Sequence, residues 1–176
     1  MAGFTQSSEG AVFFLDTNIF VYALLSSEPL KRQCALQLIE RALVSHLGCT
    51  SYQVMQEFAN VSTGKFARRF TTGECKQFMG AAMQPLNRVS SSPELLNNAL
   101  DLQLDTHYSF YDCLVLTAAL EAGAQVLFTE DLQHNQLVGG TLRIVNPFLA
   151  LANEAEEAAG QTPAPTSPGT DPRSCG

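Results

Sequence analysis

The stretch from Val12 to Asn18 constrains this chain most strongly. An apolar run, Val12-Phe13-Phe14-Leu15, gives way at once to Asp16-Thr17-Asn18. Its aromatic and β-branched residues predict a strand buried on both faces, and the apolar residues from Ile19 to Leu25 predict a helix directly after it. Asp16 would then lie at the carboxyl edge of a sheet, where α/β proteins bind ligands. Alternatively, Asp16 or Thr17 only caps the helix, and this stretch alone leaves both interpretations open.

The rest of the chain alternates short apolar runs with amphipathic segments of helical period. Such alternation predicts parallel strands joined by helical crossovers, with helices on both faces of the sheet. We therefore expect a three-layer α/β/α domain with a central parallel sheet of about five strands. The expected strands cover residues 12–15, 46–50, 87–89, 125–129 and 142–145.

A length of 176 residues, of which 45% are hydrophobic, fits one folded domain with a substantial core. We place this domain at residues 1–152. From residue 153 the composition changes to Ala, Glu, Gly, Pro, Ser and Thr, which cannot bury enough apolar surface to offset chain entropy. Residues 153–176 are therefore predicted to be a flexible tail.

The sequence predicts a cytoplasmic protein. No apolar run is long enough to cross a bilayer, and the N-terminus lacks the pattern of a signal peptide. The five cysteines include no CxxC pair, which favours reduced thiols over a disulfide framework or a zinc site. The net charge is −7, but cations bound among carboxylates would offset part of it, so acidity does not exclude a nucleic-acid partner.

Four acids from separate segments are expected to meet at the carboxyl edge of the sheet. Asp16 and Asp131 follow buried strands, and Asp112 lies three residues after Ser109 at a helix start. Glu57 lies in the second turn of the helix after the second strand, within reach of a long side chain. Each acid alone is explained as a cap or a solvated position. All four on one edge are better explained as one site.

Electrostatics indicates what this site would hold. Two carboxylates about 4 Å apart repel by about 4 kcal/mol at an effective dielectric constant of 20, so several of them need protons or cations. No Lys or Arg is adjacent in sequence to any of the four acids. Ligation by oxygen alone favours Mg²⁺ or Mn²⁺ over zinc, and such a site supports phosphodiester hydrolysis.

Four segments resemble, in order, the acidic motifs of PIN-domain ribonucleases. They are Phe-Leu-Asp16-Thr-Asn-Ile-Phe-Val-Tyr, Gln-Val-Met-Gln-Glu57-Phe, Ser-Phe-Tyr-Asp112-Cys-Leu-Val-Leu-Thr-Ala-Ala and Phe-Thr-Glu-Asp131-Leu-Gln-His. The closing Arg-Ile-Val-Asn-Pro-Phe is similar to bacterial toxins of the VapC type. The resemblance covers residues 11–148. Asn135 departs from it, because close relatives tend to have Gly there, and we expect only a local change of turn.

The resemblance implies a magnesium-dependent endoribonuclease, usually a homodimer, that is held inactive by a cognate antitoxin protein. Its catalytic, metal-binding acids would be Asp16 and Asp112 first, completed by Glu57 and Asp131. Three polar residues would support them, namely Thr17, Asn18 and Thr129. RNA would be the substrate, and no membrane would be involved.

Two other classes of protein and one non-catalytic function are alternatives to a PIN-domain ribonuclease. A phosphatase of the haloacid dehalogenase type needs a second Asp at the position of Asn18, and a receiver domain needs a paired Lys at a strand end, which we do not find. A non-catalytic PIN-fold module that binds RNA or protein remains the alternative. Lys65, Arg68 and Arg69 form a basic cluster that is either a phosphate-contacting patch or a solvated helix end.

Overall fold

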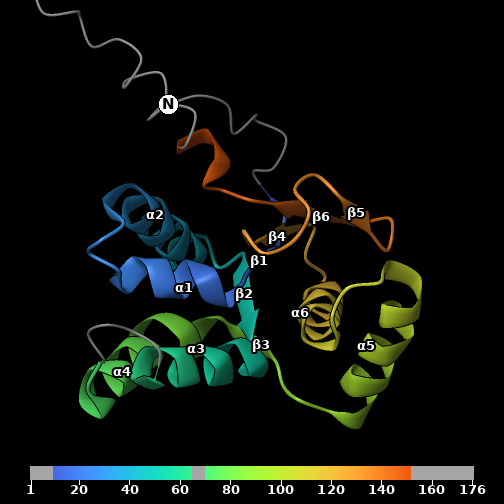
Figure 1. The fold of residues 1–176 in the computed structure, drawn as a ribbon, viewed down its shortest axis with the longest axis horizontal. Helices are drawn as coiled ribbons and strands as arrows, with labels where there is room; N and C mark the ends of the chain where they lie inside the picture. Colours follow the sequence, from blue (N-terminus) through green and yellow to red (C-terminus); the bar gives the residue numbers. More distant parts are fainter. Residues whose placement is uncertain (1–9, 65–69, 152–176) are drawn as a thin grey trace, which may run out of the picture.

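The strands form one sheet that runs through the middle of the molecule (Figure 1). The computed structural model describes residues 10–64 and 70–151. In this part of the chain the strand order is β3-β2-β1-β4-β6-β5, and all neighbours pair in parallel except β5 with β6. The strands are β1 (Phe13–Leu15), β2 (Gly48–Ser51), β3 (Asn87–Val89), β4 (Val126–Phe128), β5 (Leu137–Val138) and β6 (Leu142–Val145).

Helices cover both faces of the sheet. Figure 1 shows α1 to α4 on one side and α5 with α6 on the other. The helices are α1 (Thr17–Leu24), α2 (Pro29–Ser45), α3 (Tyr52–Gly64), α4 (Thr72–Phe78), α5 (Pro93–Thr106) and α6 (Phe110–Glu121). The predicted three-layer α/β/α class is confirmed, and the structure adds one short antiparallel edge strand, β5.

The hydrophobic core confirms the interpretation of the first strand. Phe13, Phe14 and Leu15 of β1 are all fully or nearly fully buried, as a central strand covered on both faces must be. Burial of Phe14 and Leu15 alone stabilises the fold by about 1.5–3 kcal/mol each relative to exposure. This strand therefore fixes the direction in which Asp16 leaves the sheet.

Two local elements differ from the sequence-based expectation. The pattern Thr71-Thr72-Gly73-Glu74 is typical of a helix start and predicts one helix to about Met83. In the structure α4 ends at Phe78 and continues as a π-helical turn over Met79–Met83 and a 3₁₀ turn over Gln84–Leu86. Pro85 lacks a backbone N–H and cannot continue an α-helical ladder, which explains why the helix changes form just before it. The second strand begins at Gly48, because His46 ends α2 in a left-handed conformation with φ of 56°.

Asn135 also adopts a left-handed backbone conformation, with φ of 66°. Glycine occupies this region without strain and asparagine tolerates it better than most residues, so a turn built for Gly can accept Asn. Across the described ranges no helix is long and apolar enough to pass through a membrane. Cys34, Cys49, Cys75 and Cys113 are free thiols there, whereas Cys175 and the predicted tail lie outside the described residues.

Candidate metal centre

The candidate site lies where the order of the strands changes direction. From β1 the chain builds the sheet outward through β2 and β3, and it then returns to the other side of β1 as β4. Phe13 pairs with Val126 and Leu15 pairs with Phe128, so β1 and β4 end level with each other. The connections leave these two strand ends in opposite directions. Such a switch point opens a crevice at the carboxyl edge of an α/β sheet.

Asp16 occupies this crevice directly after β1. It is the N-cap of α1, and its Oδ1 accepts a hydrogen bond of 2.7 Å from the Thr17 N–H. Its side chain is only 7% exposed. The pKa of Asp16 is raised to about 6, chiefly by burial and to a smaller extent by the charges of Asp131 and Glu57, while hydrogen bonds from Thr129 and the Thr17 backbone oppose the shift. Asp16 therefore does cap α1, and at the same position its buried carboxyl lies near the charges of Asp131 and Glu57.

Glu57 reaches the same crevice from α3. Its Oε2 accepts a hydrogen bond of 2.8 Å from the Thr17 hydroxyl. Tyr52 is the first residue of α3, so Glu57 lies in the second turn of this helix, as the sequence predicted. The length of the Glu side chain bridges the distance from that turn to the end of β1.

Asp131 comes from the segment after β4. Asn18 Nδ2 donates hydrogen bonds of 3.1 Å to Asp131 Oδ2 and 3.0 Å to the Thr129 hydroxyl oxygen. The Asp131 N–H also donates to that hydroxyl oxygen at 3.2 Å. The three polar residues named as supporting groups, Thr17, Asn18 and Thr129, therefore all bond to acids of the candidate site.

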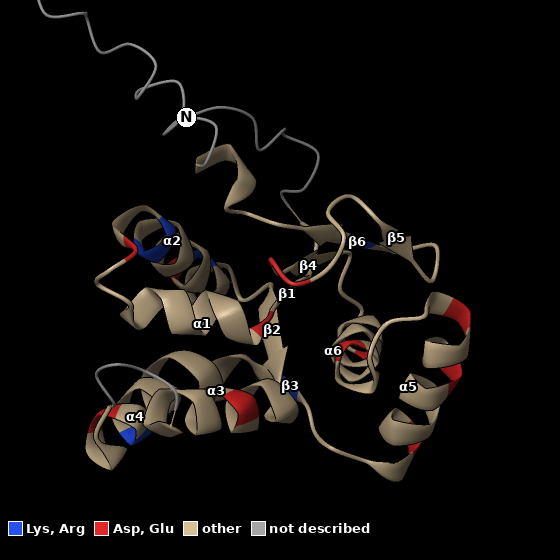
Figure 2. Cartoon of the chain, in the orientation of Figure 1, with Lys and Arg blue, Asp and Glu red and all other residues tan. Residues whose placement is uncertain are grey.

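Asp112 lies at the start of α6, on the opposite side of the sheet from α3 (Figure 2). Ser109 is the N-cap of α6, and its hydroxyl donates a hydrogen bond of 2.6 Å to Asp112 Oδ2. The Asp112 N–H in turn donates to the Ser109 hydroxyl oxygen at 3.2 Å, which completes a capping box. Asp112 is half-buried, and it lies at the N-terminal end of α6, which is the end that faces the crevice.

All four predicted acids line one small pocket. The other side chains around it are Thr17, Tyr111, Val115 and Leu132, and none of the described residues that line it is basic. Tyr111 and Leu132 were not among the predicted site residues. Each directly precedes or follows a predicted acid, so adjacency in sequence was the only indication available.

The four carboxylates do not converge on one position that a metal ion could occupy. In residues 10–64 and 70–151, no group of three or more Asp, Glu, His or Cys side chains is arranged so that it could hold one metal ion. Glu57, Asp112 and Asp131 are each engaged by a hydroxyl or amide donor of the protein instead. These three side chains are exposed or half-buried, so rotation about their χ angles can redirect their oxygens.

The donor set itself fits a hard divalent cation. Every titratable group around the pocket is a carboxylate, apart from the Tyr111 phenol. Magnesium and manganese prefer such oxygen ligands. Asp16 is buried, and no basic residue is among the described residues that line the pocket, so a bound cation would supply the positive partner that its negative charge lacks.

Glu130 is excluded from the candidate site although it precedes Asp131. Its Oε2 forms an ion pair of 2.7 Å with Lys31 of α2, and its Oε1 accepts a hydrogen bond from the Tyr22 hydroxyl of α1. Lys31 Nζ also lies 4.4 Å from the centre of the Tyr22 ring. This cluster joins the two helices to the loop after β4 and so holds the backbone that presents Asp131.

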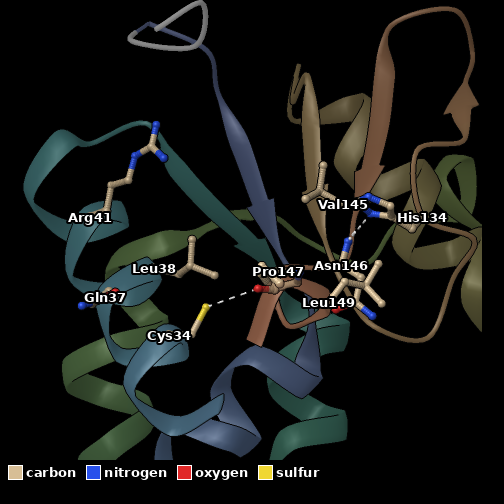
Figure 3. Close-up of a pocket in the computed structure, with 10 residues that line it drawn as sticks. Cys34, Gln37, Leu38, Arg41, His134, Val145, Asn146, Pro147 and Leu149 are labelled. Atoms are coloured by element: carbon tan, nitrogen blue, oxygen red, sulfur yellow. Dashed lines mark hydrogen bonds between the residues drawn. The ribbon is translucent and has the colours of Figure 1, made fainter. Parts of the chain in front are cut away.

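A larger pocket of about 510 Å³ lies between α2 and the segment that follows β6 (Figure 3). Cys34 and Leu38 of α2 face Pro147 across it, and the Cys34 thiol donates to the Pro147 carbonyl oxygen at 3.7 Å. At its rim, His134 Nδ1 accepts a hydrogen bond of 3.0 Å from the Asn146 N–H. None of the described residues lining this pocket is acidic, so it is separate from the candidate metal centre.

Comparison with protein families decides what kind of domain carries this site. The model of the PIN domain matches residues 13–139, which is most of the chain and includes all four acids. The chain belongs to the PIN domain family. No curated protein is similar enough to this chain to count as a match.

PIN domains are generally metal-dependent nucleases, so membership in this family suggests a nuclease-type function and implies binding of nucleic acid. The resemblance drawn from the four acidic motifs is confirmed at this level. Lys65, Arg68 and Arg69 lie outside the described residues of this PIN domain, so both interpretations of that basic cluster stay open.

Proposed function

We propose that this PIN domain is a divalent-metal-dependent endoribonuclease that hydrolyses phosphodiester bonds in RNA. The observation that carries the proposal is the meeting of Asp16, Glu57, Asp112 and Asp131 around one pocket without a basic residue to neutralise them. Acids from four separate elements have no structural need to share a pocket. Their mutual repulsion costs stability unless a cation offsets it.

In this proposal the four acids hold Mg²⁺ or Mn²⁺, with the buried Asp16 as the fixed ligand. The cation would supply Lewis-acid activation of water and neutralise charge on the phosphate. Thr17 holds Glu57 and Asn18 holds Asp131, so these polar groups set the directions from which the two acids approach. Orientation by such neighbouring hydrogen bonds commonly changes metal affinity or activity by 10- to 100-fold.

The test is cleavage of a circular RNA, which only an endonuclease can open. We expect cleavage with Mg²⁺ or Mn²⁺ and none with EDTA. Asp112→Asn, purified in parallel, should be inactive while keeping the melting temperature of the wild type, because Asn can still take part in the helix cap. Undiminished cleavage in EDTA, or equal cleavage by the variant, would contradict the proposal.

One observation favours the alternative of a non-catalytic module that binds RNA or protein. The acids are hydrogen-bonded within the protein and do not converge on one point in the described structure. A binding module would retain RNA without cutting it at any Mg²⁺ or Mn²⁺ concentration. The same circular RNA, followed by gel shift and by strand opening, separates the two functions.

We further propose that the protein is a VapC-type toxin in the cytoplasm, paired with an antitoxin protein and present as a homodimer. The four motifs and the closing segment Arg143–Phe148 support the toxin assignment. Leu96, Leu100 and Leu104 support an interface, since they expose 44%, 50% and 78% of their surface along α5. Expression in a bacterial host should arrest growth, and the Asp112→Asn variant should not.

A further inference from the structure

Tyr111 is an exposed aromatic residue at the mouth of the acidic pocket. It is the second residue of α6, directly before Asp112, and 70% of its surface is exposed. It lines the same pocket as the four acids. An aromatic ring of this size is normally buried, where it contributes strongly to the core. Exposure of this ring beside a candidate phosphate-cleaving centre therefore suggests a role in binding the substrate.

The Tyr111 ring packs against the ring of its neighbour in sequence. Phe110 is half-buried, and its ring packs against Tyr111 with centroids 5.6 Å apart and planes inclined at 70°. Two rings packed edge to face leave at least one face of Tyr111 uncovered by Phe110. Among the described residues, the Tyr111 hydroxyl makes no hydrogen bond that would account for the exposed position.

The lining of the pocket combines two kinds of side chain. Four are acids, and Tyr111, Val115 and Leu132 add apolar surface beside them. Val115 and Leu132 are buried, at 5% and 8% exposure, whereas Tyr111 is exposed. A nucleotide combines matching groups, a phosphate that a bound cation would attract and a flat base that an aromatic ring can stack on. Single-stranded nucleic acids are commonly bound by bases stacked on exposed aromatic rings.

We propose that Tyr111 is a binding platform for one RNA base next to the cleaved phosphodiester bond. The proposal rests on the nuclease function proposed above and adds the group that positions the substrate. The RNA would need to be single-stranded at this point, because a paired and stacked base does not present a free face. Stacking does not depend on base identity, so the platform would confer a preference for unpaired RNA without a sequence preference.

The experiment compares two ligands on four proteins. The ligands are a short fluorescent uridine oligomer and an oligomer of equal length whose ribose-phosphate units lack bases. The proteins are the wild type, Tyr111→Leu, Tyr111→Phe and Val44→Ala. Val44 is the control for loss of an exposed apolar side chain, since it is 75% exposed near the end of α2, away from the pocket. Affinity is measured by anisotropy with Ca²⁺, and gels confirm that the RNA stays intact.

Base stacking contributes about 1–3 kcal/mol, so Tyr111→Leu should weaken binding of the uridine oligomer by about five- to 150-fold. Tyr111→Phe keeps the ring and should bind within about twofold of the wild type. Val44→Ala should bind as the wild type does. The abasic oligomer should bind the wild type and Tyr111→Leu equally. With Mg²⁺ and the uridine oligomer, Tyr111→Leu should raise KM more than it lowers kcat.

Equal weakening of both oligomers by Tyr111→Leu, or no weakening of either, would overturn the platform. If the wild type still cleaves RNA in that case, the nuclease proposal stands and only the stacking role fails. If the wild type neither binds nor cleaves RNA with any of these cations, both proposals fail together. Melting curves of Tyr111→Leu and Tyr111→Phe exclude a folding defect as the cause of a loss.

Discussion

The hydroxyl of Thr17 donates a hydrogen bond of 2.8 Å to the carboxylate of Glu57, 40 positions further along the chain. Thr17 opens α1 directly after β1, and Glu57 belongs to α3, which follows the neighbouring strand β2. The bond therefore joins two strand-to-helix junctions at the carboxyl edge of the sheet. Thr17 is buried whereas Glu57 is exposed, so the rigid partner sets the position of the mobile one.

Thr17→Val removes this hydroxyl and keeps the shape of the side chain. We expect the Mg²⁺ concentration needed for half-maximal cleavage to rise by about 10-fold or more, because Glu57 loses its orienting partner. The free energy of unfolding should fall by only about 0.5–1.5 kcal/mol, since water can replace the bond at the exposed Glu57.

Thr63→Val is the matched control for this change. Thr63 lies in the same helix as Glu57, but its hydroxyl bonds to the Ala59 carbonyl oxygen at 2.7 Å, away from the pocket. Its Mg²⁺ requirement should equal that of the wild type. An unchanged Mg²⁺ requirement in Thr17→Val would show that Glu57 does not depend on this bond.

The pKa of Asp16 predicts how the stability of the metal-free protein depends on pH. Burial and neighbouring acids raise the pKa to about 6 from 3.8, so the folded protein holds this proton more tightly than the unfolded chain does. The stabilisation is complete below about pH 4 and is lost as the pH rises through 6. A shift of this size corresponds to about 3 kcal/mol.

Asp16→Asn isolates this contribution, because it removes the charge and keeps a good helix cap. In EDTA, the unfolding free energy of the variant relative to the wild type should increase by about 2–3 kcal/mol between pH 4 and pH 7. Chemical denaturation at several pH values measures the difference. A difference that stays constant over this range would mean that Asp16 carries no unfavourable charge in the folded protein.

Gly48 at the start of β2 should not tolerate a side chain. A Cβ there would lie 2.6 Å from Cα and 2.1 Å from Cβ of Ala42 in α2, and backbone atoms cannot give way cheaply. Gly48→Ala should lower the unfolding free energy by at least about 2 kcal/mol, in the upper range for overpacking. Gly73→Ala in the first turn of α4 has only one atom near, at 3.9 Å, and should be neutral or slightly stabilising. Equal melting temperatures for the two variants would contradict the close approach of α2 and β2.

The chain beyond the domain gives a prediction that rests on sequence alone. Residues 161–176 are rich in Pro, Gly, Ser and Thr, with too little apolar surface to offset the entropy of ordering them. Their deletion should leave RNA cleavage unchanged and shift the melting temperature by less than about 5 °C, or roughly 1 kcal/mol. A larger decrease would show that the tail packs against the domain.

The main features of the fold follow from patterns that are local in sequence. Four apolar residues before Asp16 predict a buried strand, and β1 is buried along its whole length. β5 was not predicted, because Leu137 and Val138 are too few to show a period. The two glycines after it were an available indication. Gly139 and Gly140 both have positive φ, which a tight turn between antiparallel strands requires.

From the sequence, the candidate site could be placed at one edge of the sheet, but the arrangement of its side chains could not be predicted. Topology brings Asp16, Glu57, Asp112 and Asp131 to that edge, because helices start where parallel strands end. The directions of their side chains depend on rotamers and on partners distant in sequence, such as Asn18 with Asp131. Tyr111 was missed for a related reason, since a single sequence does not tell an exposed aromatic residue from a buried one.

If the proposed function is right, these four carboxylates form a site for a divalent cation. Crystals of the wild type and of Asp16→Asn, both soaked in Mn²⁺, test it most directly through anomalous scattering. We expect a strong peak in the wild type within coordination distance of Asp16 and at least one of Glu57, Asp112 and Asp131, and a weak or absent peak in Asp16→Asn. A wild-type pocket without such a peak, or an equal peak in both crystals, would contradict it.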